Sequence, residues 1–91
     1  MSKNVGLVRV PMEFILDLDV PPEDLRTKLV LPGNVNIYQT YEDFYRQTFN
    51  FMLISTVPVD GVTYPTAPGC EVPEAIVNFR DGLILVGNKG E

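Results

Sequence analysis

Every even-numbered residue from Val8 to Val20 is apolar, and this alternation constrains the fold more than any other feature of the chain. Charged residues such as Arg9 and Glu13 occupy odd positions between them. A period of two is that of a β-strand, in which successive side chains point to opposite faces. The pattern predicts one long strand over 5–20, with Pro11 at a sheet edge or dividing the run into two shorter strands.

Size and composition favour a small binding protein over an enzyme. The 91 residues predict a single domain, 1–91, whose modest core is smaller than most enzyme folds need to enclose a substrate. The single cysteine cannot form an internal disulfide, so we expect a reducing, cytoplasmic location. No segment approaches the ~20 apolar residues of a membrane span, and the N-terminus lacks a signal-peptide pattern. We therefore expect no membrane association.

The charge distribution disfavours nucleic acid as a partner. The net charge is −5, and phosphate backbones repel an acidic domain of this size. All charged residues from Glu13 to Asp24 are acidic, whereas the basic residues are scattered along the chain. A basic protein partner fits this distribution better than a nucleic acid, and Glu13, Asp17 and Asp19 are the residues that we expect to meet it.

The segment after Thr40 has the features of an amphipathic helix. The Thr40 hydroxyl is placed to accept from the N–H of Asp43, and Glu42 is correctly spaced for an ion pair with Arg46 one turn later. Aromatic and apolar residues recur at spacings of three and four up to Met52. The pattern predicts the main helix at about 41–53. A shorter helical turn is expected after Pro22, where carboxylates follow a proline.

Turn signals in the rest of the chain predict β-structure. Pro32-Gly33 is typical of a type II turn that leads into a strand at Val35. Asp60-Gly61 and Asp81-Gly82 lie between β-forming residues, which predicts two hairpins. In the second hairpin a two-residue loop pairs Phe79 with Ile84 and Val77 with Val86.

These patterns together predict an α+β domain. It consists of a mostly antiparallel sheet of five or six strands with one main helix packed on it.

The segment Phe14–Val20 ends in Asp17-x-Asp19-x-Val20 and resembles the first motif of the haloacid dehalogenase phosphatases. The resemblance implies Asp17 as a nucleophile and Asp19 as a general acid, with Mg²⁺ between them. That family also needs a parallel sheet with crossover helices, a later lysine and a further acidic pair, which this short, hairpin-rich chain does not supply. We therefore expect no enzymatic activity, and we interpret these carboxylates as a solvated acidic stripe or a docking site.

The chain lacks the residues that other catalytic or metal-binding sites need. The chain contains no histidine, so Cys70 has no neighbouring imidazole to activate it. One cysteine without histidine also cannot supply a closed zinc site. We expect no metal and no cofactor, and we expect Cys70 in a loop or in the core.

The aromatic residues near the middle of the chain provide a further candidate surface. Most of these rings are expected in the core, but tyrosines at its rim can anchor a partner or stack on a planar ligand. Tyr38, Tyr41 and Tyr45 are the candidates for that role. Apolar residues on faces assigned to solvent indicate a homodimer or higher oligomer. The expected interface residues are Leu7, Ile15, Leu83 and Leu85.

The predicted function is that of a small acidic interaction protein that acts through its surface and self-association. Inhibitors, adaptors and accessory subunits, including those encoded by phages, belong to this class. One alternative is an oligomer that captures a small planar ligand, with tyrosine and phenylalanine stacking and with Arg26, Arg46 or Arg80 meeting an anionic group. The other is a structural component of a virion or particle.

Overall fold

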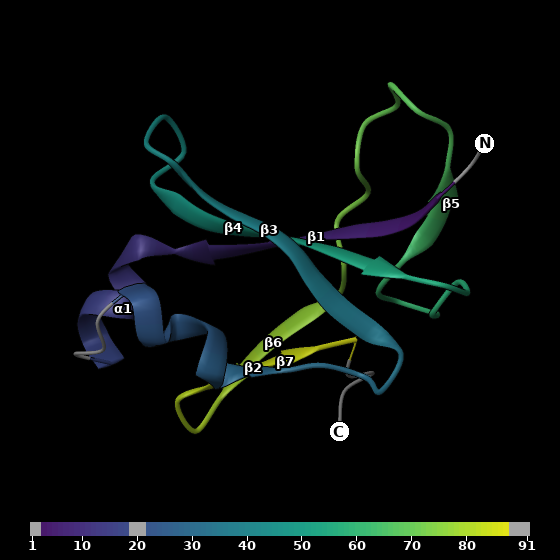
Figure 1. Cartoon of the computed structure of the whole chain (residues 1–91). Coiled ribbons are helices and arrows are strands. Elements are labelled where there is room, and N and C mark those ends of the chain that lie inside the picture. The colour runs from purple at the N-terminus through teal and green to yellow at the C-terminus, as the bar shows by residue number, and fades with distance from the viewer. Residues whose placement is uncertain (1–2, 19–21, 88–91) are drawn as a thin grey trace.

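The computed structural model describes residues 3–18 and 22–87, and within them the fold is mostly β (Figure 1). The larger sheet has the order β3-β4-β1-β5 and consists of β1 (Lys3–Pro11), β3 (Val35–Asp43), β4 (Thr48–Ser55) and β5 (Tyr64–Thr66). The smaller sheet has the order β2-β7-β6 and consists of β2 (Leu29–Val30), β6 (Val77–Arg80) and β7 (Leu83–Val86). Helix α1 (Met12–Leu18) and the 3₁₀ helix η1 (Pro22–Lys28) lie at one end of the molecule.

The predicted main helix is wrong, because that part of the chain forms the hairpin of β3 and β4. The two strands pair as far as Asp43 and Thr48, and residues 44–47 form the loop. Asp43 Oδ1 accepts a hydrogen bond from the backbone N–H of Arg46 at 3.2 Å, as the cap of a helix does. Gln47 then adopts a φ of 57° and turns the chain back. The predicted cap at Thr40 is wrong, because Thr40 lies within β3 and the cap-like contact forms instead at Asp43, where the loop begins.

The fold class is accordingly β-rich rather than a sheet with one main helix packed on it. Phe51, Leu53 and Ser55 are buried at alternate positions of β4. Aromatic and β-branched residues fit such a pleated, half-buried surface well. A helix of this length gains most of its stability from tertiary packing, and here β4 packs as a strand between β1 and β3.

The predicted long first strand is correct only as far as Pro11. Proline has no N–H for the ladder, and the chain enters α1 directly after it. In the helix Ile15 is buried at 6% exposure while Leu16 is 78% exposed, which is the reverse of what the alternation predicts. Ile15 therefore belongs to the core and does not face solvent. The short helix expected after Pro22 is present as η1.

The predicted Asp81-Gly82 hairpin is confirmed. Strands β6 and β7 pair in the expected register, with Phe79 opposite Ile84. Asp81 and Gly82 have φ values of 54° and 75°, which is the signature of a type I′ turn.

The Asp60-Gly61 segment makes a tighter structure than the expected hairpin. The carbonyl of Val59 accepts from the N–H groups of Val62 and Thr63, both at 2.9 Å. A single bridge between Val59 and Thr63 replaces a ladder. Pro32-Gly33 also differs from expectation, because the carbonyl of Pro32 accepts from Val35 and the proline therefore occupies the first turn position. The strand expected at Val35 is β3.

The core lies between the two sheets and is closed at one end by α1 and η1. The smaller sheet includes one parallel pair, in which Leu29 of β2 lies opposite Ile84 of β7. Phe14 of α1 contacts Phe79 of β6, with 4.5 Å between the ring centroids. The buried residues of the core are Val8, Val10, Ile15, Leu25, Val35, Phe51, Leu53, Val62, Ile84 and Val86.

Replacing Gln47 by glycine distinguishes the hairpin from a helix. Glycine tolerates positive φ, so Gln47→Gly is expected to raise the free energy of unfolding by up to about 1 kcal/mol. The same change inside a helix costs about 1 kcal/mol. Urea denaturation measures the difference. The control Gln39→Gly, in the middle of β3, is expected to destabilise, and destabilisation by both variants to the same extent would contradict the turn at Gln47.

Gly6 is the position where two backbones approach most closely. A Cβ built on Gly6 would lie 1.9 Å from the carbonyl oxygen of Val62, which cannot move without disturbing the turn at Gly61. Gly6→Ala is therefore expected to lower the free energy of unfolding by about 3 kcal/mol or more. Gly33→Ala is the matched control, because no atom lies within 4 Å of its added Cβ. Equal stability of the two variants in urea would contradict this packing.

Candidate functional site

The face of the larger sheet that points away from the core has a polar region around Asn50. Arg9 of β1 and Tyr41 of β3 both lie opposite Asn50 of β4, so the three side chains share this face. Asn50 is 1% exposed, and its side-chain oxygen accepts a hydrogen bond from the Thr48 hydroxyl at 2.8 Å. The sheet therefore places a cation and a phenol on a rigid, hydrogen-bonded support.

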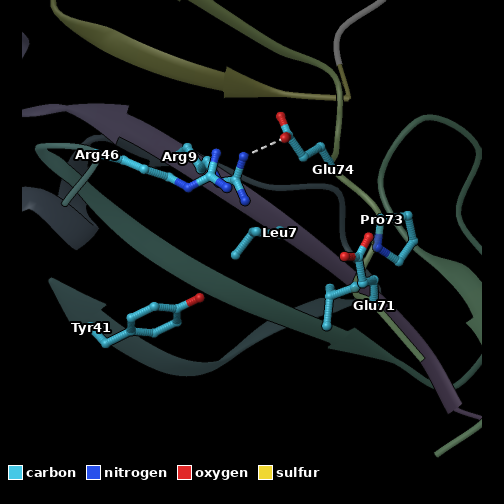
Figure 2. A pocket seen from close by; sticks show the side chains of 8 residues that line it. Leu7, Arg9, Tyr41, Arg46, Glu71, Pro73 and Glu74 are labelled. Carbon is cyan, nitrogen blue, oxygen red and sulfur yellow. Dashed lines mark hydrogen bonds and ion pairs between the residues drawn. The ribbon is translucent and has the colours of Figure 1, made fainter. Parts of the chain in front are cut away.

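The segment before β6 turns this polar region into a cleft of about 530 Å³ (Figure 2). The Leu7 N–H donates to the carbonyl of Pro73, and the Ala75 N–H donates to the carbonyl of Leu7, both at 2.9 Å. These bonds hold one wall of the cleft against β1. The residues that line it are Leu7, Arg9, Tyr41, Arg46, Glu71, Val72, Pro73 and Glu74.

An ion pair crosses one end of the cleft. The terminal nitrogen Nη1 of Arg9 donates to Oε2 of Glu74 at 2.6 Å, and the two side chains are 29% and 59% exposed. Nε of Arg9 is buried and has no acceptor among the described residues. The terminal nitrogens of Arg9 carry N–H donors beyond the one that holds Glu74, whereas the buried Nε is out of reach of a ligand in the cleft.

Arg46 reaches the same cleft from the loop between β3 and β4. Its Nε lies 3.6 Å from Oδ2 of Asp43, a long contact, and its side chain is 56% exposed. Within the described residues no hydrogen bond or ion pair occupies the Tyr41 hydroxyl or the Glu71 carboxylate. The cleft thus combines two guanidinium groups, a phenol and a free carboxylate.

The structure brings only Tyr41 of the three predicted tyrosines into the cleft. Tyr38 is 63% exposed at the irregularity between Ile37 and Gln39, where β3 carries an extra residue. Tyr45 is 97% exposed in the hairpin loop, beside Phe44 at 73%. These rings are therefore available at the surface rather than in the core.

The predicted acidic stripe is not formed as a strand face. Glu13 is exposed on α1, Asp17 lies in the same helix, and Asp19 lies outside the described residues. The motif that resembles the phosphatases needs an apolar strand before its first aspartate, but Phe14 and Leu16 belong to α1. The strand context of that motif is absent here.

The four predicted interface residues divide into two groups. Leu7 is 5% and Ile15 is 6% exposed, so the expectation that they face solvent is wrong. Leu7 is covered because a distant segment pairs with its backbone. The side chains of Leu83 and Leu85 lie on the outer face of the smaller sheet, whereas that of Ile84 points to the core. Leu83 is 37% exposed, and Leu85 is partly buried.

Sequence reasoning missed Arg9, Glu71 and Glu74 as members of one site. The sequence shows Arg9 as a charged residue within an apolar strand. No local pattern connects it with Glu71 or Glu74, which lie more than sixty positions later. Within the described residues no group of cysteines and carboxylates is arranged to hold a metal ion, and Cys70 is exposed with a free thiol. Among these residues, no helix has the length and apolar character needed to cross a membrane.

Comparisons with protein-family models, curated proteins and solved structures gave no match to this chain.

Proposed function

We propose that this chain is a small non-enzymatic interaction protein that binds an extended segment of a partner protein along the open edge of β3. The observation that carries the proposal is the position of β3 as the terminal strand of the larger sheet. A terminal strand offers unpaired N–H and C=O groups that a partner strand can use. Six of the nine residues of β3 are exposed.

The composition of β3 supports binding rather than protection of this edge. Natural proteins often block an edge strand with lysine or proline, and β3 contains neither. The exposed rings of Tyr38, Phe44 and Tyr45 lie on or beside it, and such rings anchor many protein interfaces. The exposed carboxylate of Glu42 and the net charge of −5 favour a partner segment with basic residues. A single exposed cysteine fits the cytoplasmic location that we propose for it.

Peptides selected from a random display library against the intact protein test this function. We expect basic, β-forming peptides whose binding slows amide hydrogen exchange in β3. Tyr38→Lys and Glu42→Lys are expected to weaken binding by about tenfold or more, since each removes an anchor or reverses a charge.

Leu16→Lys is the matched control, because Leu16 is 78% exposed on α1, away from β3. Equal loss of binding in the control, or protection of other strands in place of β3, would contradict the proposal.

Self-association is a second candidate, favoured by the outer face of the smaller sheet. Val30 lies opposite Leu85 on this face, and Val30 and Leu83 are 46% and 37% exposed. A two-fold dimer that paired two such faces would bury the same patch from each copy.

Light scattering coupled to gel filtration tests self-association. The dimer mass is expected at micromolar concentration, and Leu83→Lys is expected to shift the protein to a folded monomer whose unfolding midpoint no longer depends on protein concentration. A monomer mass for the unchanged protein would exclude this face as an interface.

A further inference from the structure

The cleft in the polar region of the larger sheet contains two arginines, of which Arg9 is paired with Glu74, and the carboxylate of Glu71, which is unpaired among the described residues. In Figure 2 the side chains of Arg9 and Arg46 both extend toward one end of the cleft, and Glu71 lies toward the other. Leu7 lies between them, on the floor of the cleft. Such an arrangement can distinguish ligands by the positions of their charges as well as by their net charge.

The cationic end is suited to a single carboxylate. A guanidinium presents a planar fork of donors that matches the two oxygens of a carboxylate. Arg9 holds Glu74 through one terminal nitrogen, and the contact of Arg46 with Asp43 is long, at 3.6 Å. The Tyr41 hydroxyl adds a neutral donor on the same face. The acidic residues in the cleft disfavour an anion that carries more than one charge.

The opposite end is suited to a cation. Glu71 is exposed and forms no ion pair within the described residues. An ionised carboxylate accepts hydrogen bonds and can therefore bind an ammonium group. The apolar side chains of Leu7, Val72 and Pro73 line the cleft along with these charges and can contact an aliphatic stem.

We propose that this cleft binds a small zwitterion in which a carboxylate and an ammonium group are joined by an aliphatic stem. Arg46 and Arg9 hold the carboxylate, Tyr41 donates to it, and Glu71 holds the ammonium group. This site does not depend on the open edge of β3. The cleft volume of about 530 Å³ accommodates a ligand of this size.

A titration followed by NMR of the intact, isotope-labelled protein tests the proposal with three probes. These are 6-aminohexanoate, hexanoate without the ammonium group, and hexylamine without the carboxylate. We expect 6-aminohexanoate to bind at least about tenfold more tightly than either single-charge probe, because each charged contact adds affinity. The shifted signals are expected at Arg9, Tyr41, Arg46 and 71–74.

Two substitutions assign the two ends separately. Arg46→Gln is expected to weaken 6-aminohexanoate and hexanoate about tenfold and to leave hexylamine unchanged. Glu71→Gln is expected to weaken 6-aminohexanoate and hexylamine and to leave hexanoate unchanged. Both residues are exposed, so neither change threatens the fold. Arg80→Gln, on β6 of the other sheet, is the matched control and should change none of the three affinities.

The outcomes separate this proposal from its competitors. Equal affinity for hexanoate and 6-aminohexanoate, or tighter binding of inorganic phosphate, would show a plain anion site and overturn it. The absence of any shift at millimolar 6-aminohexanoate would also overturn it. Tyr38→Lys should leave this titration unchanged while weakening peptide binding at the β3 edge, so failure of either site is distinguishable from failure of the other.

Discussion

The antiparallel ladder between β1 and β4 supports every other part of this molecule. It runs from Asn4 opposite Ser55 to Pro11 opposite Thr48 and occupies the centre of the larger sheet. β4 holds β3 on its other side, while β1 holds β5 and the segment around Glu74. Because both strands are central, their backbone groups are paired and their side chains have fixed directions. A chain of this length has few other long-range pairings from which to build a core.

The two faces of this ladder have separate uses. On one face Val8 and Val10 are fully buried against the smaller sheet. On the other face, Asn50 lies between Arg9 and Tyr41. The segment 73–75, which is hydrogen-bonded to the backbone of Leu7, forms one wall of the polar cleft. The cleft thus exists because one strand serves the core and the site at the same time. The outer strand β3 is left with an open edge, so the same sheet provides two distinct surfaces for binding.

Local sequence patterns predict local structure reliably where neighbouring residues alone decide it. The Asp81-Gly82 turn and the register of Phe79 with Ile84 follow from residues adjacent in sequence, and both were predictable. The segment 41–53 was not, because spacings of three and four indicate a helix when the segment is considered alone, whereas its residues divide among β3, the loop 44–47 and β4. The cap-like contact of Asp43 is confined to that loop, where its carboxylate accepts from the N–H of Arg46. Pairing with β1 selects the strand, and no local signal reports that pairing.

The sequence by itself determined the first strand up to Pro11, the short helix after Pro22, the second hairpin and the excess of negative charge. It also identified Tyr41 and Arg46 as candidates for ligand contacts. Only the tertiary structure decided that Leu7 is buried, and that Arg9 and Arg46 face Glu71 across one cleft. Turns depend on the backbone preferences of a few neighbouring residues, which the sequence states directly. The cleft is assembled from β1, the hairpin loop and the segment before β6, so it depends on long-range strand pairing. The free energy of that pairing comes from the whole sheet and is not carried by any local pattern.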